Sequence, residues 1–192
     1  MTHPGKSKQA KSKSALINAF DELVLQRPYS EFHIADIISA ADVSRSTFYE
    51  HFRNKEDILR LSLTGILGPL ANAGFDEGDV DGIAFVLEHF REFESLAKVY
   101  LNEPIFNVVV SLLGELVESR LGNEVEPSSC SFPLNLLASQ IASSTMGVIK
   151  TWLGESGRVN AQDLASQLQL GSEAIRLSAV ACRDGKRQSF DS

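Results

Sequence analysis

The chain has little of what marks secreted, metal-bound or membrane-spanning proteins. Its 192 residues include two cysteines, Cys130 and Cys182, which stand far apart and form no CxxC pair, so we expect free thiols rather than a disulfide framework or a zinc site. No stretch approaches the roughly 18 uninterrupted apolar residues of a membrane helix. The early lysines are not followed by the apolar run and cleavage site of a signal peptide. We therefore expect a cytoplasmic protein without a membrane partner.

Catalytic motifs are also missing. The sequence contains no GxSxG elbow, no glycine-rich phosphate loop after a strand, and no carboxylate or His/Cys cluster at ligand spacing. The GESG at 154–157 falls between two expected helices and lacks the strand that an exposed nucleophile needs. We therefore expect no enzymatic activity, no cofactor and no bound metal.

The charge is divided unevenly along the chain. The net charge is −7, but residues 1–60 hold nine Lys or Arg against eight Asp or Glu, and residues 61–192 hold nine against seventeen. The acidity therefore belongs to the second part. The first twenty residues contain four lysines and no acid, which is the pattern of a flexible basic arm beside a phosphate-contacting surface. A plain solvated tail is the alternative.

The first sixty residues predict short helices separated by turns. Apolar residues recur at three- and four-residue spacing over 16–24, which is typical of an amphipathic helix that begins at Ser14. Pro28 ends that helix, because proline lacks an amide hydrogen and disfavours helical geometry in the residue before it. A second apolar stripe follows over 34–41, with His33 in the capping position.

The next turn leads into a compact unit of helices. Residues 42–43 turn the chain, and Ser44 is placed to cap a third helix through its hydroxyl, as Asn54 is for a fourth. Phe48 and Phe52, four residues apart, face inward and tie the third helix to the first two. Two short helices joined by a tight turn, with another helix packed across them, form a helix-turn-helix unit.

Beyond residue 60 the periodicity stays helical, and no segment alternates with period two over the length of a strand. Gly65, Gly68 and Pro69 predict a kink or an end in the fourth helix, and GFDEGDVDG at 74–82 predicts a loop. Further helices are expected over 83–93, 96–101, 106–121, 132–153 and 161–180, with a loop at 122–131. The chain is therefore predicted to be all-α, with a helix-turn-helix domain over 1–60 and a second helical domain over 61–192.

The outward face of the third helix carries the candidate DNA contacts. Arg45 is the first candidate for a base contact, because a guanidinium can bind both major-groove acceptors of guanine. Ser46 suits a base or a phosphate, and donors on the same side of the helix suit phosphates. A solvated arginine and a structural histidine at position 51 are the alternatives. The predicted DNA-binding set is Arg45, Ser46, Thr47, Tyr49, His51, Lys55, Ser44 and His33.

Residues 43–59, VSRSTFYEHFRNKEDIL, resemble the TetR family of bacterial transcriptional regulators. In that family a turn, a short helix with a tyrosine after a hydrophobic residue, a His-Phe pair and a Lys-Glu step follow one another in this order. The similarity extends back through AFDELVLQRPYSEFHIADI to about Leu16. Two positions depart from the family pattern, Asp42 in place of glycine and His33 in place of threonine. Aspartate tolerates the left-handed conformation better than most residues, so we expect the turn to persist.

The resemblance implies a ligand-responsive transcriptional regulator, most simply a repressor, that binds a two-fold symmetric operator as a homodimer. It also implies that the last two long helices pair with those of a second copy. The predicted interface residues are Ile149, Trp152, Leu153, Leu164 and Leu168. Ordinary intrachain core is the alternative for this apolar stripe.

A small-molecule effector would bind in the second domain, in a pocket lined mostly by apolar side chains. The predicted lining residues are Phe85, His89, Phe90, Phe93, Tyr100, Phe106 and Met146. Aromatic residues at helical spacing are also typical of ordinary core, which is the alternative reading. At the level of function, the alternative is a helical interaction or small-molecule-binding module that has the same fold and binds no specific operator.

Overall fold

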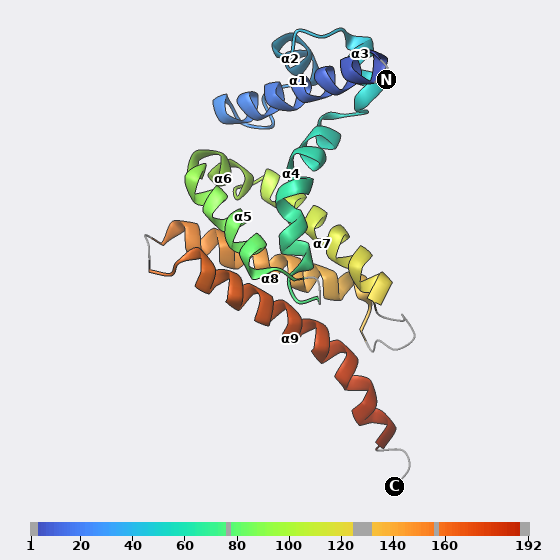
Figure 1. The fold of residues 1–192 in the computed structure, drawn as a ribbon, viewed down its shortest axis with the longest axis vertical. Coiled ribbons are helices and arrows are strands. Elements are labelled where there is room, and N and C mark those ends of the chain that lie inside the picture. Colours follow the sequence, from blue (N-terminus) through green and yellow to red (C-terminus); the bar gives the residue numbers. More distant parts are fainter. Residues whose placement is uncertain (1–3, 76–77, 125–131, 156–157, 189–192) are drawn as a thin grey trace.

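The computed structural model describes residues 4–75, 78–124, 132–155 and 158–188, with side chains left out for 4–7, 124 and 179–188. This part of the chain forms nine α-helices and contains no strand, so the predicted all-α class is confirmed (Figure 1). Cys130, the side chain of Cys182 and most of the predicted loop at 122–131 lie outside the described residues. The helices are α1 (Pro4–Gln26), α2 (Ile34–Ala40), α3 (Arg45–His51), α4 (Lys55–Asn72), α5 (Val80–Glu92), α6 (Glu94–Tyr100), α7 (Ile105–Glu124), α8 (Leu134–Gly154) and α9 (Ala161–Gln188).

The helices form two packed parts joined by α4. Helices α1 to α3 lie together at one end of the molecule, and α8 and α9 cross the other part (Figure 1). Helix α4 packs against α1 on one side and against α7 on the other. In the second part α7 packs along α8, and α5 packs along α9. The buried apolar residues of all nine helices belong to one continuous core cluster.

Helix α1 is longer than its apolar stripe predicts. It begins at Pro4 rather than Ser14, so the lysines at positions 6 to 13 lie on a helix, and the prediction of a flexible arm is wrong. Proline is favoured in the first turn of a helix, because its missing amide hydrogen has no intrahelical acceptor there. The side chains of Leu16 and Phe20 are fully buried on the inward face of this helix. The helix ends at Gln26, two residues before Pro28, as predicted.

The turn between α2 and α3 has the conformation that the sequence predicts. Asp42 adopts a positive φ of 50°, in the left-handed region that aspartate tolerates. The hydroxyl of Ser44 then accepts a hydrogen bond from the backbone N–H of Thr47 at 3.1 Å, which confirms the predicted cap of α3. Asn54 caps α4 in the same way, because its side-chain oxygen accepts from the N–H of Asp57 at 2.8 Å.

Helix α4 continues through the segment where we expected it to kink or end. It runs without a break in its helical assignment to Asn72, with Pro69 in its interior, so the predicted end is wrong. A proline ring normally presses on the backbone of the residue four positions earlier. That residue is Gly65, and a Cβ built at this glycine would meet nothing within 4 Å.

The helices of the second part are those predicted, with shifted ends. Helix α5 begins at Val80, inside the segment predicted as a loop, because Asp79 accepts a hydrogen bond from the N–H of Asp81 at 3.0 Å and caps it. The turn before it passes close to α9. Gly74 has a φ of 85°, and a Cβ there would lie 2.5 Å from the backbone nitrogen of Glu173, so this approach requires glycine.

In the described part of the chain, no single helix is both long enough and apolar enough to cross a bilayer. One pair, Glu94–Tyr100 with Ile105–Asn123, reaches that length and composition when the two helices are taken together, and it is bent by 82°.

Candidate nucleic-acid interface

Aromatic packing fixes the orientation of α3. Phe48 is fully buried and Phe52 is 4% exposed, which confirms that both anchor this helix to the core. Inside the first part, Phe20 of α1 meets Phe32 edge-on, with ring centroids 5.8 Å apart. With one side of α3 held in this way, Arg45, Ser46 and Tyr49 are exposed, as predicted.

A cluster of hydroxyl groups lies at the start of α3. The Ser44 oxygen is 2.8 Å from the hydroxyl of Ser46 and 2.8 Å from that of Thr47, while it also accepts the backbone N–H of Thr47. Ser44 and Ser46 are exposed, and Thr47 is half-buried. Hydroxyl and backbone donors at a helix start are typical partners of phosphate oxygens.

Arg45 and Tyr49, one turn apart on α3, support each other. A terminal nitrogen of Arg45 donates to the Tyr49 hydroxyl at 3.4 Å, and the guanidinium carbon lies 5.5 Å from the centre of the tyrosine ring. The contact holds the long arginine side chain against an exposed aromatic surface. It therefore orders Arg45 before any nucleic acid is bound.

His51 is half-buried and contacts the first helix rather than open solvent. Its Nε2 atom lies 2.9 Å from the hydroxyl oxygen of Ser12 on α1. The prediction placed this imidazole against a phosphate, with a bond to a main-chain carbonyl as the alternative. The observed partner is a side-chain hydroxyl, so one ring nitrogen is already engaged, and a phosphate contact through the other stays a prediction.

Lys55 holds the loop between α1 and α2. Its ammonium group donates to the carbonyl oxygen of Phe32 at 2.7 Å and to that of Tyr29, and it lies 3.9 Å and 4.4 Å from the centres of the Tyr29 and Phe32 rings. Burial lowers the pKa of Lys55, and the charge of Asp36 opposes this shift. Two of the three ammonium hydrogens are thus used within the chain, and the third is what remains for the predicted phosphate contact.

His33 occupies the capping position of α2, as predicted, and its side chain is exposed. Its backbone N–H donates to a carboxylate oxygen of Asp36 at 2.7 Å. Asp36 also forms an ion pair with Arg27 of 3.2 Å. The hydrogen bond from His33 and the charge of Arg27 lower the pKa of Asp36. The Asp36 carboxylate therefore stabilises the start of α2, and a DNA contact by His33 stays a prediction.

A buried polar contact joins the two parts of the molecule. One carboxylate oxygen of Asp21, on α1, accepts hydrogen bonds from the hydroxyl of Ser62 on α4 at 2.9 Å and from that of Tyr100 on α6 at 3.1 Å. Burial raises the pKa of Asp21 and also that of Tyr100, where the charge of Asp21 adds to the effect. The Tyr100 hydroxyl is therefore protonated at neutral pH and donates to the carboxylate.

A second contact between α4 and the later helices is an ion-pair cluster. The two terminal nitrogens of Arg60 lie 2.5 Å and 3.1 Å from the carboxylate oxygens of Glu115 on α7, and its Nε donates to Glu56 at 3.1 Å. The four-residue spacing of Glu56 and Arg60 is readable in the sequence. Glu115 is 55 residues away, and no sequence signal identified it.

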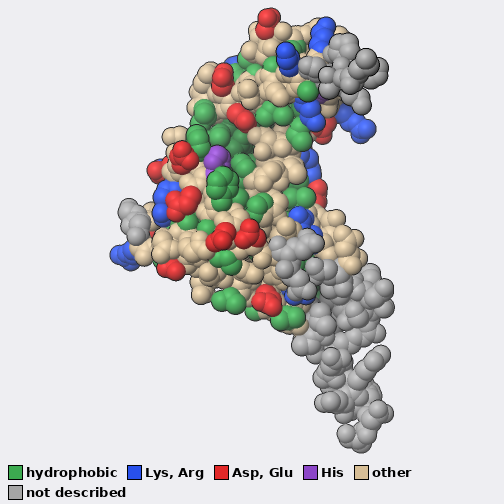
Figure 2. Space-filling model, viewed as in Figure 1, with side chains coloured by type: hydrophobic (Ala, Val, Ile, Leu, Met, Phe, Trp, Pro, Cys, Tyr) green, Lys and Arg blue, Asp and Glu red, His purple; other side chains and the backbone are tan. Residues whose placement is uncertain are grey.

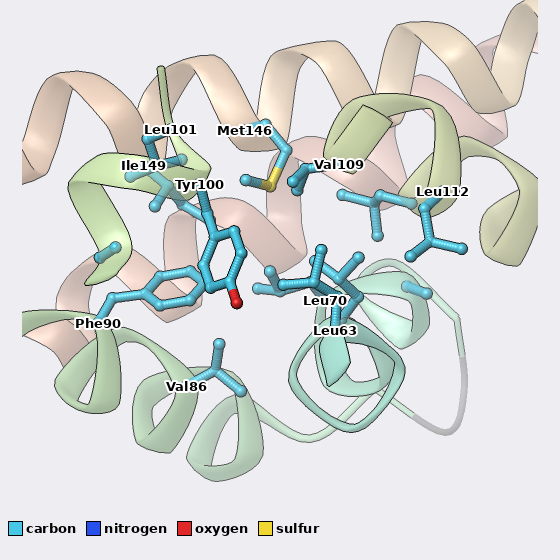
Figure 3. Close-up of a cluster of buried hydrophobic side chains, with 14 of the residues drawn as sticks. Leu63, Leu70, Val86, Phe90, Tyr100, Leu101, Val109, Leu112, Met146 and Ile149 are labelled. Carbon is cyan, nitrogen blue, oxygen red and sulfur yellow. The ribbon is translucent and has the colours of Figure 1, made fainter. Parts of the chain in front are cut away.

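The seven residues predicted to contact an effector lie in different environments in the structure. Phe90, Tyr100 and Met146 are buried and lie near one another in the core of the second part (Figure 3). Phe85 is 74% exposed and Phe93 is 48% exposed, so neither lies in the core with these three, and a ligand contact by either stays a prediction. The remaining two are half-buried. His89 contacts the ring of Phe93, and Phe106 lies beneath the ammonium of Lys150.

The five predicted interface residues face the core of their own chain. Four of them are at most 6% exposed, and the fifth, Leu153, is half-buried against the core. Packing within their own chain therefore accounts for the burial of four of them, and a contact of these residues with a second copy stays a prediction. The four are Ile149, Trp152, Leu164 and Leu168. Their spacing in the sequence predicts a buried apolar stripe, but it does not indicate whether the same chain or a second copy covers that stripe.

Residues 16–61 match the family model of bacterial regulatory proteins of the tetR family. Among solved structures, the TetR transcriptional regulator from Streptococcus agalactiae 2603V is 26% identical, with a TM-score of 0.56 over 88% of this chain and 97% of that one. A putative TetR-family regulator from Syntrophomonas wolfei is 19% identical, with a TM-score of 0.48 over 88% and 96%. NalD, the secondary repressor of the MexAB-OprM efflux pump in Pseudomonas aeruginosa, is 17% identical, with a TM-score of 0.49 over 85% and 95%. No curated protein matches the chain.

The α2–α3 unit and its outward-facing side chains define an all-α protein with an N-terminal helix-turn-helix DNA-binding domain. Residues 16–61 carry the DNA-binding domain of the tetR family, and the chain as a whole is similar in fold to a TetR transcriptional regulator. The family that residues 43–59 predict is therefore confirmed.

Proposed function

We propose that this protein is a repressor that binds a two-fold symmetric DNA operator as a homodimer and releases it in response to a small molecule. The observation that carries the proposal is the outward face of α3. On this face Arg45 is exposed and ordered by Tyr49, beside the hydroxyl cluster of Ser44, Ser46 and Thr47. A guanidinium reads guanine through paired hydrogen bonds, and the hydroxyls suit the adjacent phosphates.

A homodimer would use an apolar surface that the chain leaves uncovered. On α9 the side chains of Leu170 and Leu177, seven residues apart and so on one face, are 58% and 48% exposed. Val148 of α8 and Val159 are also exposed, and both line a groove of about 320 Å³ at the junction of α8 and α9. We expect Leu170→Glu to dissociate the dimer in sedimentation experiments, whereas Leu25→Glu, at an equally exposed position on α1, should leave it intact.

The response to an effector would pass through α4 and α6. The core around Phe90, Tyr100 and Met146 is where an apolar ligand would insert, and Tyr100 is hydrogen-bonded to Asp21 of the DNA-binding domain (Figure 3). A ligand that moved Tyr100 would therefore shift α1 and α4 relative to the second part. A coupling free energy of about 1–3 kcal/mol corresponds to roughly a 5- to 150-fold change in operator affinity. Compounds that raise the melting temperature should weaken operator binding in the same range, and stabilising compounds without that effect would refute the coupling.

The DNA-binding part of the proposal is tested by selection of bound fragments from randomised DNA. Two recognition helices related by two-fold symmetry must enter major grooves about one helical turn apart, or a multiple of it. The expected result is an enriched site with two inverted half-sites at such a spacing. Recovery of unenriched DNA with steeply salt-dependent binding, or no recovery, would contradict operator recognition.

A further inference from the structure

The beginning of α1 lies beside the recognition helix. Residues 4–14 of α1, called here the lysine segment, precede the apolar stripe that packs this helix into the core, and they are helical. At about 1.5 Å per residue the segment extends the helix by about 16 Å. In Figure 1 the N-terminal end of α1 lies next to α3. A hydrogen bond of 2.9 Å between Ser12 and His51 joins the lysine segment to α3.

The direction of this hydrogen bond follows from a second one. The Ser12 hydroxyl donates its only hydrogen to the backbone carbonyl of Gln9, 3.0 Å away. For both bonds to exist together, the Nε2 atom of His51 must carry a hydrogen and donate it to Ser12. His51 therefore connects the last turn of α3 to the lysine segment through a directed bond, whether its ring is neutral or charged.

The lysine segment presents positive charge next to the proposed DNA interface. Lys8 and Lys11 are exposed and three residues apart, so they share one side of the helix. No acidic residue occurs before Asp21. Lys and Arg side chains are visible at the end of the molecule where α1 begins (Figure 2). The surface hollow beside Lys11, of about 480 Å³, has no carboxylate among its lining residues, which are Ala10, Lys11, Ser14, Ala15 and Asn18.

We propose that the lysine segment is a second DNA-contacting element, in which Lys8 and Lys11 bind backbone phosphates flanking the groove that α3 enters. Ser12 and His51 are positioning residues that hold the segment at a constant angle to α3. This inference rests on the proposed function, because it needs α3 to dock on DNA. A phosphate contact adds affinity without base preference. The segment should therefore strengthen binding and leave the selected sequence unchanged.

The experiment measures the affinity of the full chain for its selected duplex as a function of salt concentration. The variant is Lys8→Ala/Lys11→Ala, in which alanine preserves helix propensity. Each phosphate contact contributes about 0.9 to the slope of log affinity against log salt concentration. A homodimer that loses two contacts per protomer should therefore show a slope about 3.6 smaller in magnitude. The matched control is Lys98→Ala/Lys150→Ala, which removes the same charge from exposed positions on α6 and α8 and should leave the slope unchanged.

The outcomes separate this inference from the proposed function. If the wild-type protein selects a site and the lysine variant binds it with an unchanged slope, the second contact element is refuted while operator recognition stands. If the wild-type protein selects no site, both fail. A smaller slope in the lysine variant, with the same selected sequence and an unaffected control, supports the inference.

The positioning role is tested at Ser12 with a conservative pair of variants. Ser12→Ala removes the acceptor of the His51 hydrogen bond, and Ser12→Thr retains a hydroxyl. We expect Ser12→Ala to reduce the salt slope at unchanged stability, because the lysines remain but are no longer held beside α3, and we expect Ser12→Thr to restore it. Equal slopes for Ser12→Ala and the wild-type protein would overturn the role of this hydrogen bond.

Discussion

The contact of Tyr100 with Asp21 gives a prediction with a definite size and pH dependence. Tyr100→Phe keeps the buried ring and removes only the hydroxyl that donates to Asp21 at 3.1 Å. A hydrogen bond to a charged group contributes about 1.5–3 kcal/mol. Asp21 is half-buried and keeps its bond from Ser62, so water replaces part of the loss. We expect the free energy of unfolding at pH 7 to fall by about 1–2 kcal/mol.

The sign of the pH dependence follows from the pKa of Asp21. The bond from Tyr100 favours the ionised carboxylate and so acts to lower the pKa of Asp21, against the larger effect of burial. Its contribution to stability is therefore fully present above the folded-state pKa of Asp21 and declines as the pH falls through that value. The loss caused by Tyr100→Phe should be larger at pH 7 than at pH 3.5.

The assay is urea unfolding of wild-type and variant proteins at equal protein concentration, because dimerisation would make stability concentration-dependent. For an m-value of about 2 kcal/mol/M, the expected loss shifts the midpoint by about 0.5–1 M at pH 7. Tyr49→Phe, at an exposed position, is the control and should change stability by less than about 0.5 kcal/mol. Equal stabilities of Tyr100→Phe and this control at pH 7 would refute the account of the contact.

Two further predictions concern Asp42 and Asp21. Asp42→Val should destabilise the protein by about 1–2 kcal/mol, since a β-branched residue is strained at a φ of 50°, whereas Asp42→Gly should not destabilise it. Equal melting temperatures for the two variants would contradict a left-handed conformation at this turn. Burial raises the folded-state pKa of Asp21 above its ordinary value of 3.8. The ionised carboxylate therefore destabilises the folded state at a pH above the raised pKa, and this destabilisation disappears at a pH below 3.8. Asp21→Asn keeps an acceptor for Ser62 and Tyr100 but removes the charge. The free energy of unfolding of this variant, relative to that of the wild-type protein, should therefore be greater at pH 7 than at pH 3.5. A difference that does not depend on pH would contradict the raised pKa of Asp21.

Local signals in the first sixty residues were sufficient to predict the helix-turn-helix unit. The caps by Ser44 and Asn54, the left-handed Asp42 and the buried pair Phe48 and Phe52 each depend on neighbours within a few residues. Such interactions repeat wherever the same local pattern occurs, and they also carry the family resemblance. The outward orientation of Arg45 follows from the same pattern, because it lies off the buried stripe.

Features that depend on distant partners were not predictable from periodicity. Ile149 and Trp152 lie on an apolar stripe, but a stripe packs equally well on the same chain or on a second copy, and the structure places it on the same chain. Helix α4 also continues past Pro69, although proline in a helix interior normally favours a kink or an end. The start of α1 at Pro4 was missed because lysine, serine and glutamine form a helix there without an apolar stripe.

The central proposal is that Arg45 contacts a base, while the other exposed side chains of α3 bind phosphates of the DNA backbone. The most direct measurement compares affinity for the selected duplex with affinity for a scrambled duplex, for the wild-type protein, Arg45→Ala and Arg53→Ala. A good paired hydrogen bond to a base contributes about 1–3 kcal/mol of discrimination. The account predicts that Arg45→Ala lowers the ratio of the two affinities by roughly 5- to 150-fold per half-site, while Arg53→Ala, which removes an exposed charge just beyond α3, leaves the ratio unchanged. An unchanged ratio for Arg45→Ala would contradict recognition through this residue.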